Sequence, residues 1–315
     1  MPVTRIVFCG TPQFAVPCLK HFLTLKDFEV AAVFTQPDRP QGRDKAVVFP
    51  PVKQVALDAG IPVHQPEKIR TPESEKILRE IVPDAIAIIA YGQIIPARLL
   101  DIPKLGWINL HASLLPKYRG AAPIQWAIAN GETKTGVTTM RIDAGMDTGD
   151  IVLQEELAIG PTETTPELSV RLSAAGAPQM EATLRGLADG SLQTRAQDHT
   201  AATMAPMLKK EDGWILWTRS AKEVFDRQRA FTPWPGIYTK FRELNCQLQG
   251  VLHEGLRQDA EPGSLLWDGK ELKVVCGGGS LLRLEHVKVE GRKQVTAQEF
   301  GNGARIAAGE RFGEV

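Results

Sequence analysis

Two polar side chains at the end of an apolar run have the right types and spacing for acyl-transfer chemistry. Asn109 and His111 lie two residues apart at the end of a run, Trp107–Leu110, that is typical of a buried strand. Because side chains alternate across a strand, the amide and the imidazole project from one face. Two hydrogen-bond donors that converge on one oxygen can stabilise a tetrahedral oxyanion. A satisfied cap at a strand end is the competing interpretation, and the pair alone does not decide between them.

Three carboxylates follow the next predicted strand, Thr135–Ile142. Asp143, Asp147 and Asp150 occupy a loop framed by glycines, which we expect near the carboxyl edge of the sheet. One of them could orient His111 and accept a proton, as in a pair of a base and its orienting group. Aspartates in loops more often cap turns. The pattern therefore leaves open which of the three acts in this way.

A basic segment, residues 35–45, is a third candidate. It has little regular periodicity and carries Arg39, Arg43 and Lys45. The functional interpretation is a mobile loop that contacts phosphates near the site. The alternative is a solvated surface loop.

Other chemistries find little support in the motifs. The turn at Gly10 lacks the second and third glycines of a dinucleotide fingerprint, and no P-loop sequence occurs. Ser113 does not lie in a nucleophile elbow. The six histidines form no HxH or HExxH pattern, so we expect no metal. The four cysteines form no CxxC pair and are expected to be reduced thiols.

The elements that must position these residues alternate between strand and helix over the first two hundred residues. The predicted strands are 5–9, 30–34, 85–90, 107–110, 135–142 and 151–153, and the predicted helices are 14–23, 73–81, 123–129 and 168–187. Such alternation predicts an α/β fold in which helices cover a mostly parallel sheet.

The composition and the predicted elements change after residue 190. Residues 191–205 are polar and read as a linker, and a helix is predicted around 220–230. Beyond it, short apolar runs separated by Gly and Asp turns predict a small β-barrel or sandwich. We therefore expect domains at 1–190 and 206–315.

Composition excludes several classes of protein. The 315 residues hold 37 Lys+Arg against 37 Asp+Glu, and 43% are hydrophobic. These values exclude a disordered chain, a fibrous chain and a nucleic-acid binder that relies on bulk positive charge. A local basic patch remains compatible with them. Because no signal peptide or long apolar run is recognised, we expect a cytoplasmic protein with no membrane partner.

At these motifs the chain resembles the folate-dependent formyltransferases over essentially its whole length. Its flanking segments are similar to the branch of that family that formylates methionyl-tRNA. The matching segments are Phe8–Phe14, Phe34–Pro40, Pro51–Lys53, Asn109–Gln125, Asp147–Asp150 and Arg229–Pro235.

The resemblance implies both an activity and the residues that perform it. The activity is formyl transfer from 10-formyltetrahydrofolate to the α-amino group of initiator methionyl-tRNA, for translation initiation. Asn109, His111 and Asp147 are the implied catalytic residues, and no metal is implied. Ser113, Leu114, Leu115 and Pro116 would line the folate pocket, while Arg43 and Lys45 would contact the tRNA. The implied fold is a Rossmann-like domain with helices on both faces, followed by an OB-like barrel that helps to hold tRNA, in a monomer.

Four alternatives stay open at this point. The acceptor could be a nucleotide-linked amino sugar, glycinamide ribonucleotide or water, or the chain could bind tRNA or folate without catalysis. The basic loop and the segment 231–235 favour tRNA over the small amines. Asp44 and Ala46 depart from the glycine and lysines common after the loop arginine, which weakens the local positive field.

Overall fold

The structure, a computed structural model, describes residues 3–41 and 46–313, and its contacts divide the chain into two units. The N-terminal unit comprises Met1–Pro123, Lys134–Ala158 and Leu168–Pro206. The C-terminal unit comprises Ile124–Thr133, Ile159–Glu167 and Met207–Val315. Each unit therefore gathers several stretches of the chain. The domain boundaries expected from the sequence stay a prediction.

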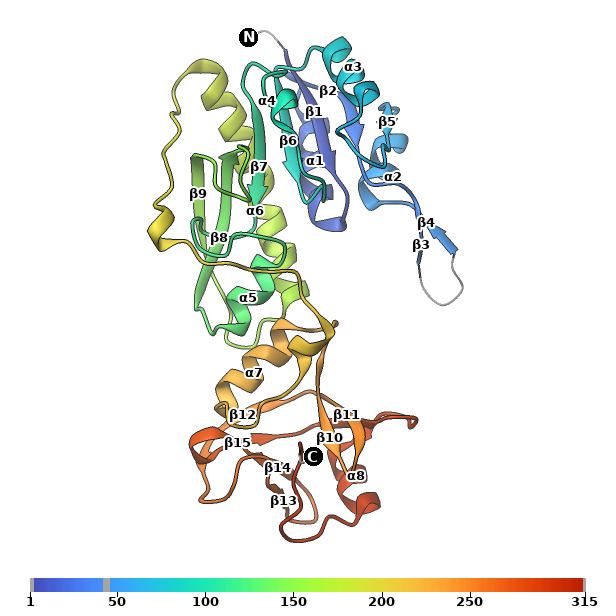
Figure 1. Cartoon of the computed structure of the whole chain (residues 1–315), viewed down its shortest axis with the longest axis vertical. Coiled ribbons are helices and arrows are strands. Elements are labelled where there is room, and N and C mark those ends of the chain that lie inside the picture. Colours follow the sequence, from blue (N-terminus) through green and yellow to red (C-terminus); the bar gives the residue numbers. More distant parts are fainter. Residues whose placement is uncertain (1–2, 42–45, 314–315) are drawn as a thin grey trace. The chain divides into compact units, whose positions relative to one another are not determined.

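A seven-stranded sheet forms the centre of the N-terminal unit (Figure 1). Its order is β5 (Val63–His64), β2 (Phe28–Phe34), β1 (Thr4–Gly10), β6 (Ala85–Ile89), β7 (Trp107–His111), β8 (Lys134–Arg141) and β9 (Ile151–Ala158). The first five strands are parallel, whereas β8 is antiparallel to β7 and β9 to β8. The prediction of a mostly parallel sheet is confirmed. The reversed direction of β8 is new, and β9, antiparallel to β8, again runs parallel to the first five strands.

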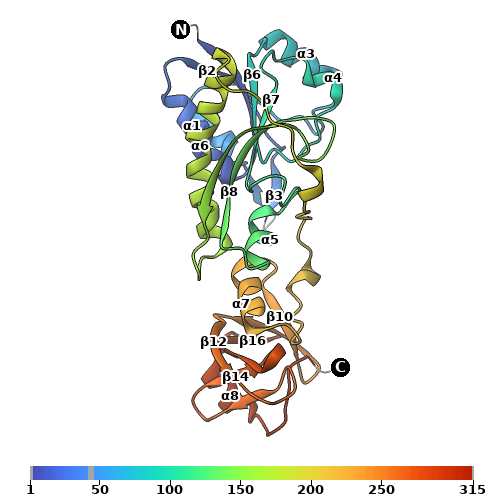
Figure 2. The same cartoon turned by 90° about the vertical axis from the view of Figure 1, so that its left-hand side faces the viewer.

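Helices lie on both faces of this sheet, as predicted. Figure 2 shows α1 (Val16–Thr24) and α6 (Thr165–Asp189) on one face, with α3 (Pro72–Ile81) and α4 (Ala97–Leu100) on the other. The five residues of β6 are all buried, because a parallel strand covered on both faces has no solvent side. Two further helical elements are η1 (Gln13–Ala15) and α2 (Pro51–Asp58).

The basic segment after β2 contains a short ladder that the sequence did not predict. β3 (Arg39–Gln41) pairs antiparallel with β4 (Ala46–Val48). Arg43 and Lys45 fall in residues 42–45, outside the described part of the chain. Our prediction that they contact tRNA therefore has no structural counterpart among the described residues.

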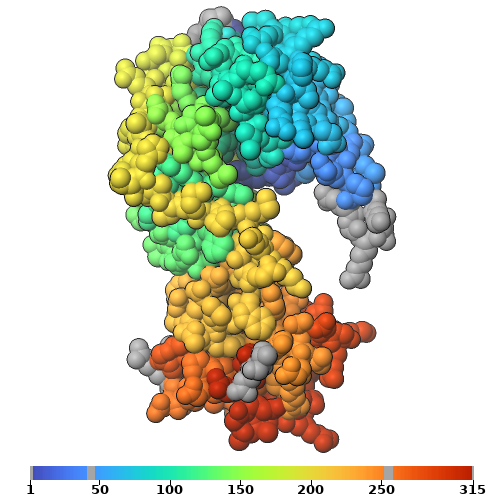
Figure 3. Space-filling model, viewed as in Figure 1, coloured from blue at the N-terminus to red at the C-terminus, as the bar shows by residue number. Residues whose placement is uncertain are grey.

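Residues 191–205, predicted as a linker, pack on the N-terminal unit. Arg195 forms a backbone bridge with Ile151 of β9 through two hydrogen bonds of 2.8 Å. The yellow segment in Figures 1 and 3 runs along the β9 side of the sheet. It includes η2 (His199–Ala201) and ends at the buried Ala205, which exchanges backbone hydrogen bonds with Arg119 and Ala122.

The C-terminal unit contains two four-stranded antiparallel sheets. One has the order β10 (Ile237–Phe241), β11 (Leu244–Gln249), β16 (His286–Val289), β17 (Val295–Thr296), and the other β12 (Leu252–Arg257), β15 (Ser280–Arg283), β14 (Leu272–Val275), β13 (Leu265–Trp267). Its helical elements are α5 (Pro123–Ala129), η3 (Lys210–Gly213), α7 (Ala221–Ala230), η4 (Gly277–Gly279) and α8 (Ala297–Ala304). The antiparallel β-region is as expected, and its OB-like character stays a prediction.

A buried ion pair ties separate stretches of the chain together within the C-terminal unit. Arg229 and Asp226 on α7 have side chains only 3% and 2% exposed and form a hydrogen bond of 2.9 Å. Arg229 Nη1 also donates to the carbonyl oxygen of Glu163 at 2.9 Å, and Thr165 Oγ1 donates to that of Ala230 at 2.6 Å. The short stretch Ile159–Glu167 is therefore part of the packing around α7.

No helix among the described residues combines the length and apolar composition that crossing a bilayer requires.

Candidate active site

Strand β7 positions Asn109 and His111 as the sequence predicts. In the parallel pairing with β6, Asn109 lies opposite Ile88, one residue before the end of β6, and β7 ends at His111. His111 is 6% exposed, whereas Asn109 is half-buried. Within the described ranges the Asn109 amide has no hydrogen-bond partner, so it is not the satisfied cap of the competing interpretation. An amide in this state can donate to a ligand.

Both ring nitrogens of His111 face oxygen atoms. Nε2 lies 2.8 Å from the carbonyl oxygen of Tyr118, and Nδ1 lies 3.6 Å from Oδ2 of Asp147. The first contact is a hydrogen bond, while the second has the spacing of an ion pair rather than of a hydrogen bond. The imidazole is thus fixed at one nitrogen and faces a carboxylate with the other.

The structure distinguishes the three aspartates that the sequence left equivalent. Asp143 accepts hydrogen bonds from Gly145 N at 3.0 Å and Thr148 Oγ1 at 2.7 Å, so it caps its own turn. Asp150 accepts from Thr194 Oγ1 at 3.1 Å. Only Asp147, among these three, faces His111. The choice of Asp147 implied by the family resemblance therefore coincides with the geometry.

The loop that carries Asp147 takes an unexpected route. We expected it near the carboxyl edge of the sheet, but β8 is antiparallel to β7 and places Arg141 opposite Ile108, near the start of β7. The loop begins at the opposite edge, and Asp147 nevertheless comes within 3.6 Å of His111. Gly149 makes this tight path possible, because a Cβ there would lie 1.9 Å from the carbonyl oxygen of Arg141.

Asp147 itself has a strained backbone. Its φ of +53° lies in the left-handed region, which is unfavourable for residues other than glycine. Its Oδ2 accepts a hydrogen bond of 2.8 Å from the backbone N–H of Gly120. Strained residues of this kind cluster at functional sites, where the surrounding contacts hold them in place.

Side chains of β8 and β9 hold the backbone of the predicted folate-lining segment Ser113–Pro116. Thr138 Oγ1 donates to the carbonyl of Ser113 at 2.6 Å, and Gln154 Nε2 donates to that of Leu115 at 2.8 Å. The side chains of Ser113 and Leu115 are buried, whereas those of Leu114 and Pro116 are partly exposed. Side-chain contacts with a ligand are therefore expected from Leu114 and Pro116.

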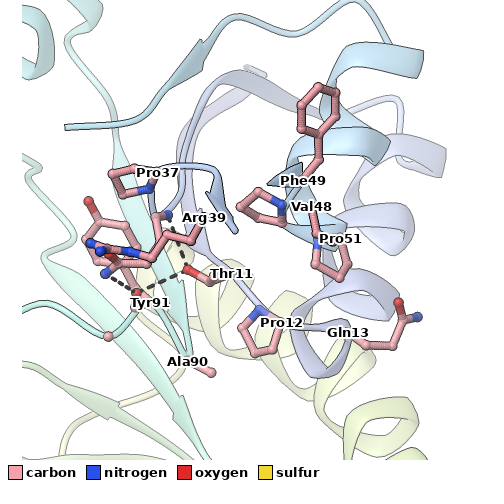
Figure 4. Close-up of a pocket in the computed structure, with 13 residues that line it drawn as sticks. Thr11, Pro12, Gln13, Pro37, Arg39, Val48, Phe49, Pro51, Ala90 and Tyr91 are labelled. Carbon is pink, nitrogen blue, oxygen red and sulfur yellow. Dashed lines mark hydrogen bonds between the residues drawn. The ribbon is translucent and has the colours of Figure 1, made fainter. Parts of the chain in front are cut away.

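A pocket of about 670 Å³ opens at the carboxyl ends of β1, β2 and β6 (Figure 4). Its lining residues are Thr11, Pro12, Gln13, Gln36, Pro37, Arg39, Val48, Phe49, Pro50, Pro51, Ala90, Tyr91 and Gly92. Asn109 and His111 are not among them, but they follow from β7, the strand next to β6. Open parallel sheets bind ligands at this edge, where the order of the strands reverses.

Polar contacts fix the walls of this pocket. Thr11 Oγ1 and Gln36 Nε2 both donate to the carbonyl oxygen of Tyr91, at 3.1 and 3.0 Å. On the other wall, Lys53 Nζ lies 4.0 Å from the ring centroid of Phe49 and forms an ion pair of 2.5 Å with Asp38. The hydrogen bond from Lys53 lowers the pKa of Asp38 below its ordinary value. The ring of Phe49 is thereby supported from one side and is 46% exposed.

Two buried side chains beside the site were not predicted. Arg119 and Gln197 are each 6% exposed and form hydrogen bonds with each other, and Gln197 also binds the Asp147 loop. Arg119 lies within the matching segment Asn109–Gln125, so the family resemblance could have pointed to it. Gln197 lies in a polar stretch in which no pattern marks it.

In the described ranges, 3–41 and 46–313, no three His, Cys, Asp or Glu side chains gather as a metal would require. The four cysteines are buried and unpaired, and burial raises their pKa values. The cysteines therefore add no reactive group to the site.

Comparison with known proteins identifies the class. Residues 4–184 match the formyl transferase family, and residues 207–305 match the formyl transferase C-terminal domain. The chain belongs to the formyl transferase family, and the resemblance seen in its motifs is confirmed.

Relatives with high identity carry a more particular name. The chain is 49% identical to a methionyl-tRNA formyltransferase of Geobacter sulfurreducens, over 98% of this chain and 97% of the relative. It is also 49% identical to a methionyl-tRNA formyltransferase of Acidobacterium capsulatum, over 98% and 99% of the two chains.

Solved structures share the fold. A sugar 3N-formyl transferase, solved in the presence of dTDP and 5-N-formyl-THF, has a TM-score of 0.67 at 18% identity and covers 93% of this chain and 100% of its own. An N-formyltransferase from Helicobacter canadensis, in complex with folinic acid and dTDP-3-aminofucose, has a TM-score of 0.66 at 17% identity, covering 90% and 98%. At these identities the likeness concerns the fold alone.

Proposed function

We propose that this chain transfers the formyl group of 10-formyltetrahydrofolate to the α-amino group of methionine esterified to initiator tRNA. The product, N-formylmethionyl-tRNA, is used to start translation. The observation that carries the proposal is the Asn109 amide beside a His111–Asp147 pair, in a chain that is 49% identical to methionyl-tRNA formyltransferases over nearly its whole length.

The reaction begins with attack by the neutral amino group on the formyl carbon. A C–N bond forms while the carbonyl electron pair moves to oxygen, which gives a tetrahedral oxyanion. The intermediate collapses by breaking the bond to N10 of the folate. The amine loses one proton and N10 gains one, so the products are a formamide and tetrahydrofolate.

Asn109 stabilises the oxyanion as a hydrogen-bond donor. His111 can take part through Nδ1, because its Nε2 is bonded to the carbonyl of Tyr118. The two side chains project from the same face of β7, and fixed donors in a partly buried site need little reorganisation when charge develops. Asp147 faces His111, holds it in orientation and helps to remove the proton that the amine loses.

The formyl donor would bind against Ser113–Pro116. Thr138 and Gln154 hold the backbone of this segment, so Leu114 and Pro116 offer a fixed apolar edge to a flat ring system. This assignment follows from the family resemblance, and the rigid backbone supports it.

The pocket at β1, β2 and β6 fits the other substrate. The pocket adjoins β6, the neighbour of β7 in the sheet. From β1 to β7 the sheet spans two strand spacings, about 10 Å, and an aminoacyl nucleoside can reach across that distance. Four prolines and Phe49 line it, and an exposed aromatic ring is a stacking surface for an unpaired base. We assign this pocket to the 3′-terminal adenosine of the tRNA. The contacts of Arg43 and Lys45 with the tRNA stay a prediction from the family resemblance.

A formylation assay tests the proposed function. The purified chain is incubated with 10-formyltetrahydrofolate and initiator methionyl-tRNA, and formyl-methionine is measured after deacylation. Parallel reactions contain a nucleotide-linked amino sugar or no acceptor. Formyl-methionine as the major product supports the proposal. Preferential formylation of the sugar, or tetrahydrofolate release that does not depend on an acceptor, would overturn it.

Replacing Phe49 by alanine is expected to weaken tRNA binding. Stacking of a base on an aromatic ring contributes about 1–3 kcal/mol, so KM for methionyl-tRNA should rise on the order of tenfold with little change in kcat. Steady-state kinetics with varied tRNA measures this. Val48→Ala is the matched control, because Val48 is an exposed neighbour that lines the same pocket without a ring. Equal KM values for the two variants would contradict the assignment of the pocket.

Salt is expected to weaken the tRNA complex to a limited extent. Each phosphate contact contributes a slope of about −0.9 to the logarithm of affinity against that of salt, so two contacts give roughly a tenfold rise in KM between 50 and 200 mM. The zero net charge of the chain argues against a much steeper dependence. Sucrose at equal osmolality is the control. A KM that is unchanged across this range would exclude phosphate contacts.

A further inference from the structure

We propose that Gln197 is a positioning residue for formyl transfer, which fixes the backbone of the Asp147 loop so that the carboxylate faces His111. The inference rests on the proposed function, because formyl transfer is the reaction in which it is measured. It assigns a role in catalysis to a residue of the polar segment 191–205, more than 80 positions along the chain from His111.

The hydrogen bonds of Gln197 use its whole side-chain amide. Its Oε1 accepts from Nε and Nη2 of Arg119, at 3.1 and 2.6 Å. Its Nε2 donates to the carbonyl oxygens of Asp147 and Gly149, at 2.9 and 2.7 Å. The two acceptor sites and the two N–H groups of the amide are all engaged.

The orientation of this amide has no alternative. A guanidinium has no acceptor and a backbone carbonyl has no donor, so a flipped amide would lose all four bonds. Both side chains are buried, where unpaired polar groups are strongly disfavoured. Gln197 is therefore held rigidly between Arg119 and the loop.

The loop requires such support because Asp147 has a left-handed backbone, with φ at +53°. This conformation is unfavourable for residues other than glycine, although less so for aspartate than for most, and contacts with the surroundings help to hold it. The carbonyl of Asp147 bonds to Gln197, while its carboxylate bonds to the N–H of Gly120. These two contacts fix the residue at both its main chain and its side chain.

The tripeptide 118–120 links this support to His111. The carbonyl of Tyr118 accepts a hydrogen bond from His111 Nε2 at 2.8 Å. The N–H of Gly120 binds Asp147, and the Arg119 side chain binds Gln197. Both members of the His111–Asp147 pair are thus oriented by one short segment and one glutamine. Loss of the glutamine releases the Asp147 backbone while His111 keeps its contact with Tyr118.

A second buried glutamine provides a matched control. Gln179 on α6 is also 6% exposed, and its Nε2 also donates to two backbone carbonyls, those of Val137 and Leu153 at 3.3 and 3.0 Å. These carbonyls belong to β8 and β9 and not to the Asp147 loop. Gln179 Oε1, unlike that of Gln197, has no partner among the described residues, so the two side chains match in their bonds to backbone carbonyls. Removing Gln179 therefore removes two such bonds from the same unit without releasing Asp147.

The experiment compares kcat and KM of full-length Gln197→Leu and Gln179→Leu, with the melting temperature of each. We expect Gln197→Leu to lower kcat on the order of 10- to 100-fold with little change in KM for either substrate, since a small misplacement of a catalytic group has effects of this size. Gln179→Leu should lower the melting temperature but not kcat.

Gln197→Glu serves where the leucine variant folds poorly. It keeps the size of the side chain and an acceptor for Arg119, but an ionised carboxylate cannot donate to the two carbonyls. We expect kcat to fall in this variant as well. Wild-type kcat in Gln197→Glu would show that the bonds to the Asp147 loop are dispensable, and would overturn the proposal.

A double-mutant cycle separates positioning from a merely structural role. If Gln197 acts through Asp147, adding Gln197→Leu to Asp147→Asn should reduce kcat little further. An undiminished additional loss would overturn the proposal, as would equal kcat losses in the two leucine variants. Absence of formyl-methionine with the wild-type chain would instead refute the proposed function, so the two failures are distinguishable.

Discussion

Asn109→Ala is expected to lower kcat for formyl transfer by about 10²–10³-fold, the usual cost of losing one donor to a developing oxyanion. KM for the formyl donor should change little, because the interaction is made in the transition state and not in the ground state. The amide has no partner in the described part of the chain, so its removal leaves no buried group of the protein unpaired. Steady-state kinetics with saturating methionyl-tRNA measures the effect.

Asn109→Asp refines this test. Aspartate has nearly the same shape, but its carboxylate cannot donate and places a negative charge beside the oxyanion. Its kcat should be at least as low as that of the alanine variant. Turnover near that of the wild type in either variant would show that Asn109 is not an oxyanion donor, whatever the acceptor.

Asp147→Asn is expected to lower kcat by about 10²–10⁴-fold, the range typical of general acid–base groups. Asparagine can still accept the hydrogen bond from Gly120 N–H, so the loop should keep its conformation. The variant loses the negative charge that faces Nδ1 of His111 across 3.6 Å. Single-turnover measurements, in which the formyl donor is added to a preformed complex of enzyme and methionyl-tRNA, report the rate of the chemical step without a contribution from product release.

Asp143→Asn is the control for this variant. Asp143 lies in the same loop and only caps a turn, through Gly145 and Thr148, so its amide analogue should keep nearly full kcat. A similar loss of kcat in both variants would mean that disturbance of the loop, and not the charge of Asp147, accounts for the effect.

Local patterns were sufficient to predict the strands of the large sheet other than β5, and the polar pair that one of them carries. The run at 85–90 predicted β6 because a strand covered on both faces consists of apolar residues. The spacing of Asn109 and His111 predicted a shared face, since alternation along a strand does not depend on the rest of the fold. These are inferences over a few residues, and such short-range rules are robust.

The same local patterns could not predict contacts between residues that are far apart in the sequence. The choice among Asp143, Asp147 and Asp150 depends on which of them the loop brings to His111, and the loop starts from a strand, β8, whose antiparallel direction was not predicted. Gln197 contacts a loop about fifty positions away, and nothing in its neighbours indicates this contact. The apolar residues at 281–289 are divided between β15 and β16, which pair in different sheets, and their sequence does not show this division.

The stretch Ile159–Glu167, packed around α7, limits where this chain can be joined to a relative in a hybrid protein. A chimera joined at residue 206 would take α7 from one parent and the partners of Arg229, the carbonyls of Gly160 and Glu163, from the other. The contact between the rings of Trp126 and Phe231 would likewise join residues from different parents. A functional hybrid must therefore carry Ile124–Thr133 and Ile159–Glu167 together with its C-terminal residues.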